Sequence, residues 1–116
     1  MDLCMRDLGK PQQKLVVDIH SVVREEFRTT DEEILGVRGI EQNTDARKAI
    51  MLLFKEHSPL QTEMPWICKY LGCRENAVEK CLCEARAQIQ WDKESAFSKT
   101  FKRICEKLNI NAQALL

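Results

Sequence analysis

The sequence predicts an all-α fold of about six helices, and three observations lead to it. Apolar residues recur at spacings of three and four in every long segment. The alternation of apolar and polar residues that marks a β-strand is missing throughout. The few glycines and prolines fall at the ends of these segments or between them. With 116 residues the chain has room for one small domain, so residues 1–116 are expected to form a single unit.

The first quarter of the chain predicts two helices. In residues 11–27 apolar side chains recur at helical spacing with charged side chains between them, which predicts an amphipathic helix. Pro11 suits the first turn of this helix. Residues 1–10 precede this pattern and can be flexible. Thr30 followed by Glu33 predicts a capping box for a short helix that ends near Gly36.

The centre of the chain predicts a loop and then a longer helix. Residues 36–43 lack periodicity and contain two glycines, so we expect a loop. Asn43 or Thr44 then caps a helix that runs to about His57, where the pair Ser58-Pro59 stops it.

Three more helices follow in the second half. Thr62 is expected to cap the first of them, which ends at Gly72 as a left-handed C-cap. The second covers about residues 75–91, and Asp92 or Ser95 caps the third. Residues 110–116 form a short tail for which no element is predicted.

The apolar faces of these helices predict the core. Both tryptophans, Trp66 and Trp91, are expected to lie in it as well. The other predicted core residues are Val16, Ile19, Val23, Phe27, Ile34, Ile50, Leu53, Phe54, Ile67, Leu71, Val78, Leu82, Ile89, Phe97, Phe101, Ile104 and Leu108.

The balance of charge excludes indiscriminate binding to nucleic acid. The chain has 18 basic and 18 acidic side chains, and residues 74–116 are only mildly basic, with eight bases against six acids. Any contact with DNA must therefore come from the placement of a few cations. No apolar run is longer than six residues, so we expect no membrane span, no secretory leader and a cytoplasmic protein.

The cysteines and histidines predict neither a metal site nor catalysis. The six cysteines include no CxxC pair, which favours reduced thiols over zinc or disulfides. His20 and His57 have no acidic or cysteine partner visible in the sequence, which favours surface or capping positions. We therefore expect no cofactor and no enzymatic activity.

Residues 62–91 have the spacing of a helix-turn-helix. In ICKYLGCRENAVEKCL, residues 67–82, Ile67 and Leu71 would lock the first helix to the second, and Val78 would anchor the second from beneath. Gly72 would supply the positive φ of the tight turn. An ordinary helical corner closed by glycine has a similar pattern, so this alternative stays open. In a helix-turn-helix the outward residues at the start of the second helix face the major groove, namely Arg74, Glu75, Asn76, Glu79 and Lys80.

Over residues 18–108 the chain resembles the C-terminal, origin-reading domain of the bacterial replication initiator DnaA. IHSVVREEFRTTDEEILG resembles its opening helices, ARKAIMLLFKEHS its long apolar helix, and FSKTFKRICEKL its last helix. MPWICKYLG resembles the helix that starts with Leu-Pro-Glu-Ile in the family. The resemblance implies a DnaA-like fold and a DNA-binding role in bacterial DNA replication. The chain has no GxxxxGK[ST] loop, so the ATPase function of an initiator is not implied.

The chain departs from the family in the residues that read DNA. Where the family has Arg-Asp-His-Thr-Thr-Val, residues 74–78 read Arg-Glu-Asn-Ala-Val, which is one residue shorter. The central loop keeps Arg38 and Arg47, but three positions that are arginine in the family are Gly39, Glu41 and Asp45. These differences imply weakened or altered specificity, and recognition of an origin sequence is not carried over.

The predicted DNA-binding residues have two roles. Asparagine is the usual bidentate reader of adenine, so Asn76 is expected to face bases together with Glu75 and Lys80. Pro65 matches the proline of the family's Leu-Pro-Glu-Ile turn. The residues expected to hold phosphates are Arg38, Arg47, Lys48 and Arg74.

Two functions from different classes remain. The first is a non-catalytic module that binds double-stranded DNA. The alternative is a helix-turn-helix fold that no longer binds DNA and docks another protein through its acidic first third or an apolar surface.

Overall fold

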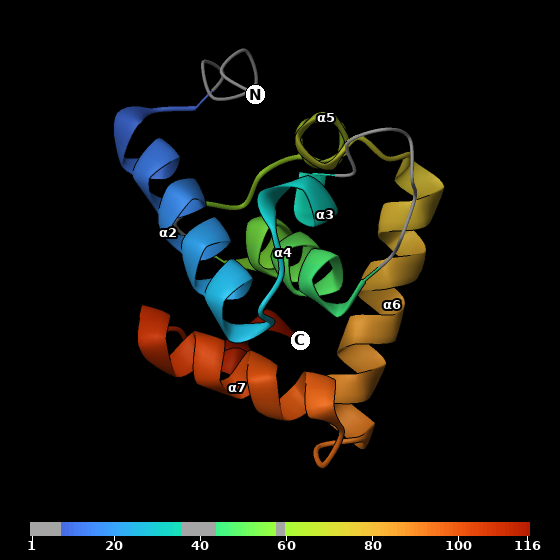
Figure 1. Ribbon diagram of the computed structural model, residues 1–116. Helices are drawn as coiled ribbons and strands as arrows, with labels where there is room; N and C mark the ends of the chain where they lie inside the picture. Colours follow the sequence, from blue (N-terminus) through green and yellow to red (C-terminus); the bar gives the residue numbers. More distant parts are fainter. Residues whose placement is uncertain (1–7, 36–43, 58–59) are drawn as a thin grey trace.

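Six α-helices and a short 3-10 helix make up the parts of the chain that the structure, a computed structural model, describes: residues 8–35, 44–57 and 60–116 (Figure 1). These described parts contain no β-strand, which confirms the all-α prediction. The predicted loop at 36–43 and the stop at 58–59 lie outside the described residues. The elements are α2 (Lys10–Glu26), α3 (Asp31–Leu35), α4 (Asp45–Glu56), α5 (Met64–Leu71), α6 (Glu75–Trp91), α7 (Ala96–Leu108) and η2 (Ala112–Leu115).

Helix α4 lies at the centre, with the other helices arranged around it (Figure 1). It contacts α2, α5, α6 and η2. Eight of its twelve residues are buried, and they lie on all sides of the helix. A helix surrounded in this way must be apolar all round or must neutralise its polar groups internally. Its sequence pattern predicted one apolar face only, so the structure buries more of α4 than expected.

Several predicted helix ends are confirmed. The side chain of Thr44 caps α4 by accepting a hydrogen bond from the backbone N–H of Arg47 at 3.3 Å. Ser95 caps α7 in the same way, with the N–H of Ser98 at 3.1 Å. Gly72 ends α5 with φ 64° and ψ 41°, in the left-handed region as predicted.

Two predicted caps differ from the structure. Glu63, not Thr62, is the N-cap of α5. The Thr62 hydroxyl instead donates to the carbonyl of Phe54 at 3.0 Å, because the chain returns toward α4 before α5 begins. In the capping box of α3, the N–H of Glu33 donates to Thr30 Oγ1 at 3.2 Å as predicted, while the Glu33 carboxylate accepts from the hydroxyl of Thr29 at 2.7 Å.

The core agrees closely with the apolar faces read from the sequence. The residues predicted from the apolar faces are all buried except Phe27 and Leu108, which are half-buried at the edge of the core. Trp66 is buried against Phe54 and Tyr70. The prediction for Trp91 is wrong: this side chain is 79% exposed, because its position on α6 lies opposite the buried side of that helix.

The C-terminal tail is ordered, although no element was predicted for it. Asn109 ends α7 with φ 58°, and residues Ala112–Leu115 form η2. Leu115 is buried and η2 packs against α4. Ile110 and Ala112 also pack against the core, so a few apolar side chains hold a turn that helical periodicity cannot reveal. Within the described residues, none of the helices combines the length and apolar character that crossing a membrane requires.

The left-handed conformation of Gly72 gives the first testable prediction. A Cβ atom at this position would meet only the Leu35 carbonyl oxygen, at an ordinary 3.5 Å, so the cost of a side chain is conformational rather than steric. Gly72→Ala should lower the free energy of unfolding by about 1 kcal/mol in urea denaturation. Gly72→Asn is the matched control, and it should cost less because asparagine tolerates this region. Equal losses for the two variants would contradict this explanation.

Candidate nucleic-acid interface

The corner between α5 and α6 has the left-handed glycine and the buried apolar residues that the sequence predicts. Gly72 turns the chain, and α6 begins after Arg74, which is its N-cap. The anchoring residues Ile67, Leu71 and Val78 are all fully buried. The two helices are therefore held in one fixed arrangement by apolar contacts on their inner sides.

The first two turns of α6 present polar side chains to solvent. Five residues predicted to face outward are exposed, and Cys83 continues the same exposed side. Neither Arg74 nor Lys80 forms an ion pair with another described residue. This surface carries two cations, two carboxylates and one amide, so its net charge is close to zero. The exposed residues are Arg74, Glu75, Asn76, Glu79 and Lys80.

The second half of α6 is tied to α4 by two ion pairs. Lys48 Nζ lies 2.9 Å from Glu84 Oε2, and Arg86 Nη2 lies 2.7 Å from Glu56 Oε1. The hydrogen bond between Lys48 and Glu84 raises the pKa of the lysine and lowers the pKa of the carboxyl. In one pair α4 contributes the cation, and in the other it contributes the anion. Opposite charges therefore face each other at both points of this contact.

Lys48 is therefore not placed as a phosphate contact, contrary to the prediction. Its side chain is only 16% exposed, and Glu84 already neutralises its charge. Carboxylates on a helix that enters the major groove would repel phosphates. Glu84 does not add a third carboxylate to the exposed start of α6, because it pairs with Lys48 of α4. Nothing in the sequence pattern indicates this pairing, since the two residues are 36 positions apart.

Arg47 is also misassigned by the sequence. It is 1% exposed, and its Nη2 atom donates to the backbone carbonyl of Leu71 at 2.9 Å. Its Nε and Nη1 atoms have no hydrogen-bond partner among the residues that the structure describes. The guanidinium thus holds the end of α5, and a phosphate has no access to it in this arrangement. The cause is the central place of α4, which turns this residue inward.

The remaining candidates lie apart. Pro65 is exposed in the first turn of α5, at the other end of that helix from Gly72, where it lines a hollow with Leu8, Gln12 and Lys69. Arg38 lies outside the described residues. The structure therefore brings together only Arg74, Glu75, Asn76 and Lys80 of the eight predicted residues.

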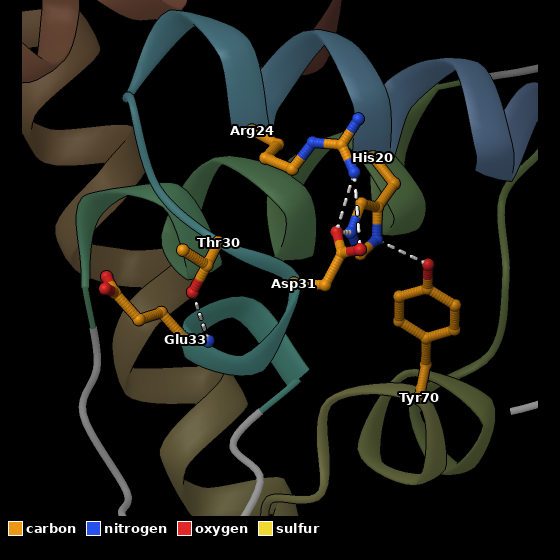
Figure 2. A network of polar contacts seen from close by, with 6 residues as sticks. All are labelled: His20, Arg24, Thr30, Asp31, Glu33 and Tyr70. Carbon is orange, nitrogen blue, oxygen red and sulfur yellow. Dashed lines mark hydrogen bonds and ion pairs between the residues drawn. The ribbon is translucent and has the colours of Figure 1, made fainter.

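A polar network that the sequence analysis missed joins three helices (Figure 2). His20 is 7% exposed, so the expected surface or capping position is wrong for it. Its Nδ1 atom lies 2.7 Å from the Tyr70 hydroxyl and its Nε2 atom 2.8 Å from Asp31 Oδ1. Arg24 Nη1 donates to both oxygens of Asp31, at 3.0 and 3.3 Å. These hydrogen bonds tie α2, α3 and α5 together.

The network engages both nitrogens of the imidazole. The hydrogen bond from His20, followed by that from Arg24, holds the pKa of Asp31 below its ordinary value of 3.8.

His57, the other histidine, is the C-cap residue of α4. Burial lowers the pKa of its ring and so favours the neutral form. The end of a helix would instead attract the charged form.

The described cysteines are thiols, and burial sets their reactivity. Burial raises the pKa of Cys105 to about 12 and raises that of Cys81 as well. Among the described residues, no group of three or more histidine, cysteine or acidic side chains is arranged to hold a metal ion.

Comparison with known proteins gave no match in any of three searches, which covered protein-family models, curated proteins and solved structures.

The buried guanidinium generates a prediction about stability. Arg47→Ala removes the long stem and leaves a cavity beside α5, so it should lower the free energy of unfolding by about 2–5 kcal/mol. Arg47→Met keeps the apolar stem and removes a buried charge that has no acidic partner, so it should change the stability by less than about 1 kcal/mol. Urea denaturation of both variants measures this. A loss with methionine as large as with alanine would show that the bond to Leu71, not the stem, stabilises the protein.

The network around Asp31 predicts a dependence of stability on pH. Because the pKa of Asp31 is lower in the folded protein than in the unfolded chain, its stabilising contribution is present above pH 3.8 and is lost as the pH falls through the folded pKa. The difference in unfolding free energy between the wild type and Asp31→Asn should therefore be steady near pH 5 and shrink toward pH 3. Glu32→Gln, on an exposed neighbour, is the control and should show no comparable trend. A difference that is the same at both pH values would contradict the assignment.

Proposed function

We propose that this chain is a non-catalytic module that binds double-stranded DNA, with α5 and α6 as a helix-turn-helix and α6 entering the major groove. The observation that carries the proposal is the contrast along α6. Its second half is clamped to α4 by two ion pairs, while its first two turns expose Arg74, Asn76 and Lys80. A recognition helix needs this combination of a fixed orientation and an uncovered N-terminal face. The resemblance to the DNA-binding domain of DnaA is part of the same proposal.

Each exposed group has a defined task in the proposed complex. The Asn76 amide can form a bidentate pair with adenine, and the Glu75 carboxylate can accept from the N4 amino group of cytosine. Arg74, at the N-terminus of α6, neutralises a phosphate. Lys80, in the second turn, was expected from the sequence to face bases, and here it is assigned to a phosphate instead, because Arg47 is buried and Lys48 is paired with Glu84. Arg47 and Lys48 are not part of this proposal, since one is buried and the other is paired with Glu84.

The charge of the surface sets the expected strength of binding. Two exposed carboxylates, Glu75 and Glu79, lie beside the two cations and repel phosphates. Non-specific affinity is therefore expected at or below the weak end of the usual range of roughly 10⁻⁴–10⁻⁶ M at physiological salt. Specific binding would depend on base contacts rather than on charge.

A second function, docking of another protein, is favoured by one observation. Trp91, at the end of α6, is 79% exposed, and tryptophan is among the residues most enriched at the energetic centres of protein interfaces. The two functions differ in the part of α6 that they use, so variants at its two ends distinguish them.

The DNA proposal predicts different effects for different residues of α6. Lys80→Ala should weaken binding to every duplex and reduce the slope of log affinity against log salt by about one unit. Asn76→Ala should cost about 1–3 kcal/mol on the preferred sequence and little on random DNA. Fluorescence anisotropy over a series of salt concentrations, first with a pooled duplex library and then with the selected sequence, measures both effects.

Two matched controls make this test specific. Lys14→Ala removes an exposed lysine from α2, on the opposite side of α4 from α6, and should leave the affinity and salt slope unchanged (Figure 1). Arg47→Met should also leave the salt slope unchanged, because its guanidinium is buried. Absence of binding to any duplex at low salt would overturn the DNA proposal in favour of protein docking. Binding that neither Lys80→Ala nor Asn76→Ala affects would do the same.

A further inference from the structure

The turn that joins α5 to α6 places two cysteines close together. Cys68 lies in the last turn of α5 and Cys73 follows Gly72. The N–H of Cys73 donates to the carbonyl of Cys68 at 3.1 Å, which is the six-residue hydrogen bond of a Schellman motif. In this motif the side chains of these two positions commonly touch. The neighbouring Cys73 also contributes to the raised pKa of the Cys68 thiol.

This pair is distinguished from the other described cysteines by access as well as by position. Cys68 and Cys73 are half-buried at the turn, whereas Cys81 and Cys105 are buried in the core. Cys81 lies near Cys73 but is only 1% exposed, so a reagent in solution has little access to it. Cys83 is exposed on α6. Among the described cysteines, only the pair at the turn combines partial exposure with a backbone hydrogen bond that joins the two residues.

We propose that Cys68 and Cys73 are a redox-modification site, at which exchange with a low-molecular-weight disulfide such as oxidised glutathione forms a reversible intramolecular disulfide. The backbone constraint that favours this bond is already present, because the Schellman turn places the two positions side by side while both cysteines are reduced.

The reaction proceeds in two exchange steps. The Cys73 thiolate attacks one sulfur of the small disulfide, forming a mixed disulfide and releasing one small thiolate. The Cys68 thiolate then attacks the Cys73 sulfur, forming the protein disulfide and releasing the second small thiolate. The two protein thiols lose two electrons and two protons in total, and the small disulfide is reduced to two thiols.

The environment of the pair sets the order and the pH dependence of these steps. Burial raises the pKa of the Cys68 thiol, and the neighbouring Cys73 and Glu75 raise it further. The raised pKa leaves Cys68 with little thiolate at neutral pH, so this residue suits the second step, the attack on a mixed disulfide that is already beside it. Exchange should be faster at mildly alkaline pH than at neutral pH, because the thiolate is the nucleophile.

The disulfide would close the turn covalently immediately before Arg74, the N-cap of α6. This would fix the corner that orients the exposed face of α6. Any consequence for DNA binding rests on the proposed function, whereas formation of the bond does not. Failure of one proposal is therefore distinguishable from failure of the other.

The test uses the full chain in buffers of defined ratio of oxidised to reduced glutathione at mildly alkaline pH. Samples are quenched with acid, alkylated and mapped by mass spectrometry after digestion with trypsin. Trypsin cleaves after Lys69, between the two cysteines, so the disulfide would link two separate peptides. We expect this linked pair to be the main oxidised species, with the loss of two thiols and full reversal by dithiothreitol.

Variants and alternative outcomes make the test decisive. Cys83→Ser is the matched control and should still form the linked peptides, whereas Cys68→Ser and Cys73→Ser should not. In Cys68→Ser the glutathione adduct at Cys73 should persist, because the resolving thiol is missing. A lasting glutathione adduct at Cys73 in the wild type would overturn the proposal. So would linkage of Cys73 to Cys81, or oxidation confined to Cys83.

Discussion

The burial of α4 is the constraint on which the rest of the structure depends. Because other helices and the C-terminal turn surround it, each polar group on α4 must find a partner inside the molecule or at its edge. Arg47 donates to the carbonyl at the end of α5, and Lys48 and Glu56 pair with residues of α6. The same contacts therefore complete the core and fix the corner formed by α5 and α6.

This constraint also decides how much of the structure could be predicted. Helix ends, the left-handed Gly72 and most of the core follow from local spacing, since each depends on residues within one or two turns. The roles of Arg47 and Lys48 could not be predicted, because their partners lie far along the chain. The burial of His20 could not be predicted for the same reason, because its partner Tyr70 lies fifty positions away. Trp91 was expected in the core as a large aromatic residue, but its position on α6 lies opposite the buried side of that helix.

The functional consequence is a division of charge between the interior and the surface. Two cations that a DNA-binding protein would place on phosphates instead stabilise the contacts of α4. The exposed start of α6 then has two cations and two carboxylates. It offers side chains that could read bases but few that could hold phosphates. In the proposed function, selectivity comes from Asn76 and its neighbours, and general attraction to DNA is weak. The thiol pair at the turn lies beside this surface, where a covalent change would act on the orientation of α6.

The most direct test of the central claim is to map binding on the protein by nuclear magnetic resonance. A ¹⁵N-labelled chain titrated with duplex DNA at low salt should show its largest amide shift changes at residues 74–80. The amides near Trp91 and those of α2 should change little. Changes centred on Trp91, or no changes at any duplex concentration, would contradict the claim that the start of α6 is a DNA-binding surface.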